Sequence, residues 1–284
     1  MFFVFVKHKY SCTYCAIIPN MSDIIQVKNL VKKFDDFVAV DDISFSVEKG
    51  QIFAFLGPNG AGKTTTIKML TTLLYPTSGS IILNDFDVMK HPKETRKSFG
   101  IVFQDPSLDT ELTAFENMEF HGVLYGLERK TMNSRIKELL ELVELWDRKD
   151  DFVKNFSGGM KRRLEIARGL LHHPAILFLD EPTLGLDPQT RNHIWEYIKE
   201  LNEKEHITVF VTTHYMEEAD RVADRVAVID HGKIVAEGTP ESLKRETHTE
   251  NLEDAFLALT GRTIRHEEVS SKDAMRINAR MWRR

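Results

Sequence analysis

Residues 57–64 read GPNGAGKT, which matches the spacing G-x-x-x-x-G-K-[ST]. Glycines let backbone N–H groups turn inward around phosphate oxygens, and a following helix directs its positive end at the same anion. Lys63 can reach the β- and γ-phosphates of a nucleotide, and the Thr64 hydroxyl can bind Mg²⁺. The candidate nucleotide-binding residues are Gly57, Pro58, Asn59, Gly60, Ala61, Gly62, Lys63, Thr64 and Thr65.

The residues around this loop predict the strand and the helix that it needs. Residues 52–56 form an apolar run typical of a buried strand, and residues 65–74 show helical apolar spacing. A strand, a glycine-rich loop and a helix in this order are the context in which the spacing indicates phosphate binding.

A pair of carboxylates follows the apolar run AILFL, where a strand is predicted over 175–180. Open α/β sheets bind ligands at the carboxyl ends of their strands, so Asp180 and Glu181 are candidates for chemistry. We expect Asp180 to approach Mg²⁺ and Glu181 to polarise the attacking water, a general-base role worth about 10²–10⁴ in rate. Taken alone, the pair also fits a capped helix start, with Asp as the N-cap.

Two further polar residues follow predicted strands. His214 ends the run TVFVTTH and could donate a hydrogen bond near the γ-phosphate, although a histidine at a strand end is more often structural. Gln104 follows the run FGIVF, and its amide could touch both Mg²⁺ and the attacking water, although an isolated glutamine of this kind is usually a surface residue. We therefore predict Glu181, His214 and Gln104 as catalytic residues, and Thr64, Gln104 and Asp180 as Mg²⁺ ligands.

Residues 157–159 read Ser-Gly-Gly and precede a cationic, helix-like run. A hydroxyl and two flexible glycines ahead of a helix resemble a second anion cradle, yet Ser157 lies 100 residues beyond Gly57. The sequence thus raises the question of why one chain needs two such elements.

The order of these motifs over residues 24–260 resembles that of the ATP-binding-cassette (ABC) ATPases. The resemblance implies an α/β fold: a P-loop NTPase cassette with a mostly parallel core sheet, an antiparallel β subdomain and an inserted helical subdomain. It also implies that Phe34 stacks on adenine and that Asp187 lies in the loop between two ATP sites. Met160 departs from the family pattern, in which glutamine is usual at this position.

In this family two cassettes pair head to tail, so the resemblance implies that Ser157, Gly158 and Gly159 form a signature loop over the ATP of a second copy of the chain. The second cradle would then serve the nucleotide of the other subunit. ATP and Mg²⁺ are the implied cofactors, and ATP hydrolysis is the implied reaction.

The stretches DEPTLGLDP, THYMEEAD and NLEDAFLALTGR are similar to those of drug-export ATPase subunits of the daunorubicin-resistance type. This resemblance implies a subunit that powers export of a drug, a lipid or a polysaccharide-like substrate through a separate integral membrane permease. The expected location is cytoplasmic and peripheral, on the inner face of the cell membrane. The alternatives are a soluble ABC ATPase acting in translation or DNA repair, and a small-molecule P-loop kinase.

Composition and layout complete the expectations. The net charge of −5 over 284 residues argues against a general nucleic-acid binder, and no run approaches the ~18 apolar residues of a membrane-spanning helix. Cys12 and Cys15 form one CxxC pair, which is weak evidence for zinc or redox chemistry. We interpret 1–20 as a non-native or disordered extension, with Met21 the true start.

Residues 21–245 are then expected to form the ABC ATPase domain, with a helical subdomain at about 105–160 to which a membrane partner docks. Residues 246–284 are expected to form a helical and basic C-terminal tail. The run RVAVIDHGKIVAEG at 225–238 is predicted as one strand.

Overall fold

The computed structural model describes residues 23–261 of the protein. The predictions made for residues 1–20, with Cys12 and Cys15, and for residues 262–284 lie outside the described residues.

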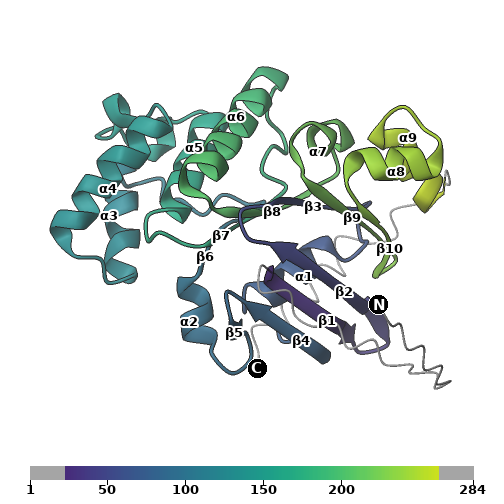
Figure 1. Ribbon diagram of the computed structural model, residues 1–284. Coiled ribbons are helices and arrows are strands. Elements are labelled where there is room, and N and C mark those ends of the chain that lie inside the picture. Colours follow the sequence, from purple (N-terminus) through teal and green to yellow (C-terminus); the bar gives the residue numbers. More distant parts are fainter. Residues whose placement is uncertain (1–22, 262–284) are drawn as a thin grey trace, which may run out of the picture.

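The core of the fold is a six-stranded sheet (Figure 1). Its strands, in spatial order, are β10 (Lys233–Gly238), β9 (Arg225–Asp230), β3 (Ile52–Leu56), β8 (Thr208–Thr213), β7 (Ile176–Asp180) and β6 (Phe99–Val102). The five strands from β9 to β6 are mutually parallel, and β10 joins the edge as an antiparallel hairpin with β9. This mostly parallel sheet confirms the predicted fold class.

Strand β3 shows why the sequence of this sheet reads as continuous apolar runs. All five of its residues are buried. Ile52, Ala54 and Leu56 belong to one hydrophobic cluster, whereas Phe53 and Phe55 belong to another on the opposite face. A parallel sheet covered on both faces needs apolar side chains at every position of its central strands.

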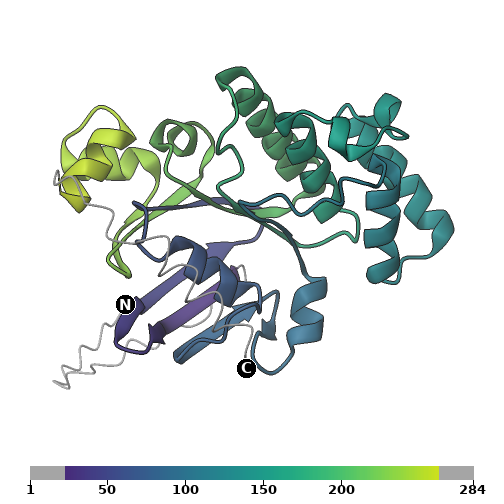
Figure 2. The same ribbon diagram turned by 180° about the vertical axis from the view of Figure 1, so that it is seen from behind.

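Different layers cover the two faces (Figures 1 and 2). One face packs against α1 (Lys63–Leu70) and a second, antiparallel sheet. This second sheet consists of β2 (Phe37–Glu48), β1 (Asp23–Phe34), β4 (Ser78–Leu83) and β5 (Phe86–Asp87). The other face packs against α5 (Gly158–Gly169), α6 (Pro188–Glu205) and α7 (Met216–Val222).

The remaining helices lie at the two ends of the molecule (Figure 1). The end that contains β6 holds α2 (Pro92–Lys97), α3 (Ala114–Leu124) and α4 (Arg129–Leu142). Helix α3 begins at a capping box, in which Thr113 and Glu116 each accept a hydrogen bond from the other's backbone N–H. Near the opposite edge lie α8 (Pro240–Thr247) and α9 (Leu252–Thr260).

Two predicted elements differ from the structure. The single strand expected over 225–238 is a hairpin, because His231 and Gly232 both adopt left-handed backbone angles and form the two-residue turn between β9 and β10. The helix expected over 65–74 ends at Leu70. Thr72 has a φ of 63°, and the N–H groups of Leu73 and Leu74 bond back to the carbonyl of Lys68, which closes the helix early.

Candidate nucleotide-binding and hydrolysis site

The glycine-rich loop connects β3 to α1 and packs tightly against a neighbouring strand. A Cβ on Gly57 would lie 2.5 Å from the backbone oxygen of Ile229, so no other residue fits there without a shift of β9. Gly62 has a φ of 110°, which side-chain-bearing residues rarely adopt. The loop therefore turns directly into the first residue of α1, Lys63.

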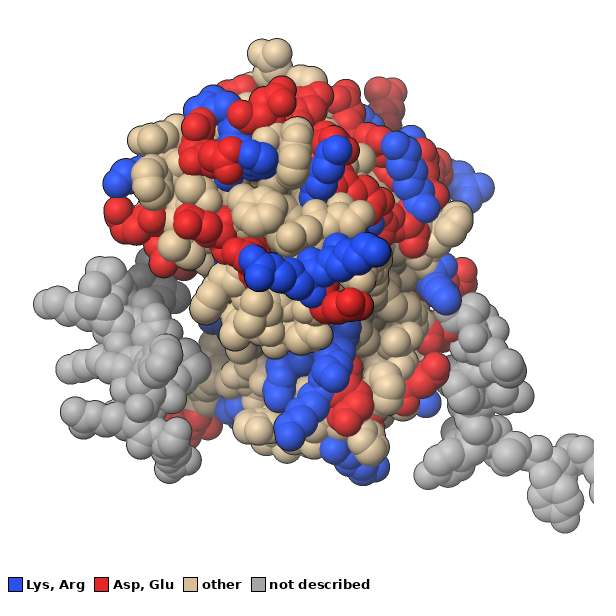
Figure 3. Space-filling view, turned by 90° about the vertical axis from the view of Figure 1, so that its left-hand side faces the viewer, with Lys and Arg blue, Asp and Glu red and all other residues tan. Residues whose placement is uncertain are grey.

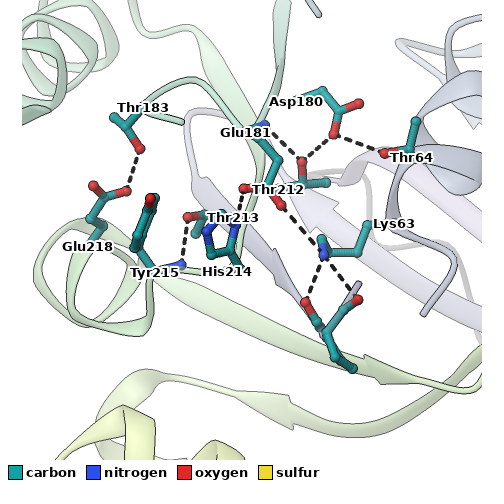
Figure 4. A network of polar contacts seen from close by, with 12 residues as sticks. Lys63, Thr64, Asp180, Glu181, Thr183, Thr212, Thr213, His214, Tyr215 and Glu218 are labelled. Carbon is teal, nitrogen blue, oxygen red and sulfur yellow. Dashed lines mark hydrogen bonds and ion pairs between the residues drawn. The ribbon is translucent and has the colours of Figure 1, made fainter. Parts of the chain in front are cut away.

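The Lys63 side chain is held inside this loop (Figure 4). Its ammonium donates to the carbonyl oxygens of Gly57 at 2.7 Å and Pro58 at 3.2 Å, and it lies 3.5 Å from Oε1 of Glu181. Burial lowers the pKa of Lys63, and the nearby Glu181 carboxylate opposes that shift. The geometry thus concentrates a positive charge beside the loop N–H groups.

Asp180, the last residue of β7, is buried and bonded to two hydroxyls. Its Oδ1 accepts from Thr212 at 2.6 Å, and the Thr64 hydroxyl lies 3.5 Å from the same atom. Burial raises the pKa of Asp180, and the hydrogen bonds from Thr212 and Thr64 oppose this.

A carboxylate and a hydroxyl are oxygen donors of the kind Mg²⁺ prefers, and Thr64 and Asp180 therefore fit this ion. Among the residues from 23 to 261, no group of three or more His, Cys, Asp and Glu side chains is arranged to hold a metal. The pair matches sites where Mg²⁺ takes its other ligands from substrate phosphates and water.

Glu181 connects three elements of the site (Figure 4). Its backbone N–H donates to the carbonyl and hydroxyl oxygens of Thr212, and its φ of 51° places it in the left-handed region. Its Oε2 lies 2.5 Å from Nδ1 of His214. A buried carboxylate held by an imidazole on one oxygen and an ammonium on the other is well positioned to orient a water molecule.

These groups share one cavity of about 560 Å³. Its lining includes the predicted residues from Pro58 to Thr65, together with Gln104, Glu181 and His214. Gln104 is exposed, and its backbone oxygen accepts a hydrogen bond from Arg162. Gly57 and Asp180 do not line the cavity, although they contact Lys63 and Thr64, which do.

Two aromatic residues flank the turn of the β1–β2 hairpin, and they differ in whether they line the cavity. Phe34 is not part of the cavity lining, and the Lys32 ammonium lies 4.9 Å from its ring centroid. Phe37, which pairs with Phe34 across the hairpin, lines the cavity and is 62% exposed. The adenine-stacking role of Phe34 stays a prediction. Sequence reasoning missed Phe37, and the motif pattern contains no signal for it.

The Ser-Gly-Gly element lies at the start of α5. Ser157 is its N-cap, and the hydroxyl accepts from the N–H of Met160. The Asp187 carboxylate caps α6 in the same way through Thr190, which shifts its pKa downward. A Cβ on Gly159 would lie 2.4 Å from Cγ2 of Thr190, so the two helix starts are in close contact.

A second cavity of about 250 Å³ lies at this place. It is lined by Ser157, Gly159, Met160, Thr190 and neighbouring residues, and it shares no lining residue with the nucleotide cavity. The structure therefore does not bring the second cradle to the phosphate loop of the same chain. Within one copy, the two elements form separate sites.

Comparison with known proteins identifies the family. Residues 40–184 match the family model described as "ABC transporter", and residues 153–220 also match an AAA-domain model. The chain is 44% identical over 220 residues to the linearmycin resistance ATP-binding protein LnrL of Bacillus subtilis, covering 78% of this chain and 70% of that protein. It is 44% identical to the daunorubicin/doxorubicin resistance ATP-binding protein DrrA of Streptomyces peucetius, covering 78% and 66%. The chain belongs to the ABC transporter family, as an ATP-binding protein.

Solved structures support the same assignment. The ATP-binding subunit of an ABC transporter superposes with a TM-score of 0.76 at 30% identity, covering 84% of this chain and all of that one. A dimeric, post-hydrolysis cassette bound to ADP and phosphate superposes with a TM-score of 0.68 at 28% identity, covering 76% and 98%.

Proposed function

We propose that this protein is the ATP-hydrolysing subunit of an export system and that it drives a separate membrane permease. The observation that carries the proposal is the single cavity that joins the phosphate loop to Gln104, Glu181 and His214. Names of relatives such as LnrL and DrrA, which refer to drug resistance, favour export over a role in translation or DNA repair.

Each residue of the cavity has a role in this reaction. The loop N–H groups and the Lys63 ammonium bind the β- and γ-phosphates, where the ammonium replaces its present carbonyl partners with phosphate oxygens. Mg²⁺ held by Thr64 and Asp180, with the Gln104 amide as a further ligand, would neutralise the charge that develops on these oxygens.

Glu181 then polarises the attacking water. His214 holds the carboxylate through its 2.5 Å contact, so that the second oxygen is directed at the γ-phosphate side of the cavity. Water is expelled from the site only if another surface closes over it, because the cavity is open on the side of Gly60 and Phe37, both of which are exposed.

We infer that a second copy of the chain supplies that surface. Ser157, Gly158 and Gly159 stand at a helix N-terminus, which suits an anion, and they do not reach the phosphate loop of their own chain. In a head-to-tail pair each of these loops faces the γ-phosphate bound by the other copy, and Asp187 lies beside it at the junction between the two sites. The dimeric relative bound to ADP and phosphate is consistent with this arrangement.

The membrane permease docks, in this proposal, on the helical region near 105–156. No helix within residues 23–261 is both long and apolar enough to cross a membrane. On α3, Phe120, Val123 and Leu124 are between 61% and 66% exposed, and a cavity of about 250 Å³ lies beside Phe120 and Leu124. We place the protein on the inner face of the cell membrane, with α3 toward the permease.

Figure 3 shows this end of the molecule, where uncharged surface is crossed by a band of Lys and Arg side chains.

Photo-cross-linkers at Phe120 or Leu124 should capture a co-expressed permease, whereas one at Leu257 on α9 should not. Phe115 on α3 and Tyr125 at its end are less useful positions, because Phe115 packs on the core and the Tyr125 ring stacks on His172 with 3.8 Å between the centroids. Capture from Leu257 but not from α3 would contradict this docking site.

Phosphate release by the purified chain tests the core of the proposal. Lys63→Ala should abolish ATP binding, and Glu181→Gln should retain binding while the turnover falls by about 10²-fold or more. Lys68→Ala is the matched control, because Lys68 lies on the same helix and does not line the cavity. ATP hydrolysis that survives Glu181→Gln would contradict the assignment of the catalytic carboxylate.

A further inference from the structure

A buried acid lies next to the site but does not line its cavity. Glu218, on α7, is 8% exposed, and its Oε2 accepts a hydrogen bond of 2.8 Å from the hydroxyl of Thr183 (Figure 4). Its Oε1 lies 3.8 Å from the guanidinium of Arg191, on the first turn of α6. Glu218 therefore joins the loop after β7 to the start of α6.

Arg191 extends these contacts toward the catalytic residues. Its guanidinium lies 4.6 Å from the ring centroid of Tyr215, a cation–π geometry. The Tyr215 ring lies 4.2 Å from the ring of His214, and the Tyr215 N–H donates to the hydroxyl of Thr213. His214 in turn contacts Glu181. A continuous set of contacts thus leads from Glu218 to the carboxylate that orients water.

These contacts connect the loop after Glu181 with the loop that contains Asp187, which is predicted to lie at the junction with a second copy of the chain. Arg191 is four residues from Asp187, whose backbone oxygen accepts the N–H of Arg191 in the first turn of α6. Thr183 is two residues from Glu181, on the strand-end loop. A movement of the loop at Asp187 would therefore shift Arg191, and through it Tyr215 and His214.

We propose that Glu218 and Arg191 are positioning residues that hold His214 against Glu181 and couple this pair to the loop that contains Asp187. The proposal rests on the proposed function for its effect on turnover, but not for its geometric content. Glu218 fixes Arg191, Arg191 packs on Tyr215, and Tyr215 fixes the ring of His214. Neither residue lines the nucleotide cavity.

Glu218→Gln and Arg191→Met test the proposal with little change in volume. The glutamine side chain still accepts the Thr183 hydrogen bond but lacks the charge that attracts Arg191, and methionine retains length without the cation. We expect kcat to fall about tenfold to hundredfold in both variants, with the KM for ATP unchanged. The double variant should be no slower than Arg191→Met alone, because Glu218 acts on His214 only through Arg191 in this arrangement. Arg191→Lys should retain most of the activity.

A measurement independent of turnover decides the geometry. The imidazole ¹⁵N signals of His214, assigned by their loss in His214→Gln, should move in both variants toward their position in Glu181→Ala, where the imidazole has no carboxylate partner. Arg221→Gln is the matched control, since Arg221 is an exposed residue of α7 beside the same acid. His214 signals that stay in place in both variants would overturn the proposal, even if stability fell. If the wild-type protein had no ATPase activity but the His214 signals of both variants moved as expected, only the proposed function would be contradicted.

Discussion

Oε2 of Glu181 lies 2.5 Å from Nδ1 of His214, and Oε1 of the same carboxylate lies 3.5 Å from the Lys63 ammonium. These three residues come from the ends of β7 and β8 and from the start of α1. Adjacent parallel strands end at the same edge of a sheet, so β7 and β8 deliver their next residues side by side. The register of the sheet thus assembles the site.

Removal of the imidazole should affect catalysis more than binding. In His214→Ala the carboxylate loses the contact that fixes its orientation, while the phosphate loop is unchanged. We expect kcat to fall about tenfold to hundredfold without a change in ATP affinity, as measured by steady-state kinetics and by titration calorimetry. His91→Ala, at an exposed histidine outside both cavities, should match wild type. A comparable loss of ATP affinity in His214→Ala would argue against an orienting role.

The contact between the two helix starts predicts a difference between neighbouring glycines. Gly159→Ala places a Cβ 2.4 Å from Cγ2 of Thr190, whose hydroxyl bond to Asp187 restrains it from turning away. We expect a destabilisation of about 1–3 kcal/mol in thermal unfolding without nucleotide. Gly158→Ala should be tolerated, because its Cβ would lie 3.5 Å from Leu186.

Thr190→Ser removes the obstructing methyl group but retains the hydroxyl. In the background of Gly159→Ala it should therefore restore most of the lost stability. Equal stability of Gly158→Ala and Gly159→Ala would show that this contact does not constrain α5.

Asp180 predicts a pH dependence of stability. Because burial raises its folded-state pKa above the unfolded value, the folded protein retains the proton where the unfolded chain has lost it. Protonated Asp180 thus contributes stability that is fully present below its unfolded-state pKa and is lost as the pH rises through its folded-state pKa. Asp180→Asn cannot ionise and should be more stable than wild type by about 0.5–2 kcal/mol at pH 8, without nucleotide or Mg²⁺.

Denaturant unfolding from pH 8 down to about pH 4, near the ordinary pKa of an aspartate, measures this difference. The advantage of Asp180→Asn should shrink as the pH falls. An advantage that grew toward acid would mean that the carboxylate is stabilised in its charged form by the fold.

Because the Phe37 ring is exposed at the rim of the nucleotide cavity, we expect Phe37 to stack on the adenine base of ATP. Base–aromatic stacking is worth about 1–3 kcal/mol, so Phe37→Ala should weaken ATP binding by about 5- to 150-fold. Phe34→Ala is the matched comparison, and we expect a smaller loss because Phe34 does not line the cavity. A larger loss at Phe34 would return the stacking role to the residue that the family pattern indicates.

Four residues that the sequence singled out lie close together in the structure, where chemistry restricts the residue type. Lys63, Asp180, Glu181 and His214 each lie at the end of a strand, or just after a strand or a glycine loop. The turn at His231 and Gly232 was missed, because its first position holds a histidine and not the asparagine or aspartate that, before a glycine, marks a two-residue hairpin turn. The helix predicted after the phosphate loop was too long, because the apolar spacing continues past Leu70, whereas the helical backbone conformation ends there.

Residues that act through long-range contacts were not predictable. Glu218 and Thr183 are 35 positions apart, and nothing in the local pattern of THYMEEAD separates the buried Glu218 from the exposed Glu217 beside it. Phe37 is found only once the hairpin is folded over the phosphate loop. Propensity and motif spacing report on neighbours in the chain, whereas these residues depend on the packing of α6, α7 and the two sheets.

The central claim is that the Ser-Gly-Gly loop of one copy completes the ATP site of another. Glu181→Gln should bind ATP and hydrolyse it slowly, which leaves the shared γ-phosphate in place, and ATP then stabilises the pair by mass action. Adding Ser157→Arg places a bulky side chain where the partner's phosphate must lie, and this double variant should bind ATP through its own loop. Sedimentation with ATP and Mg²⁺ measures the outcome directly. We predict a dimer for Glu181→Gln and a monomer for the double variant, and a double variant that dimerises as well as the single one would contradict the claim.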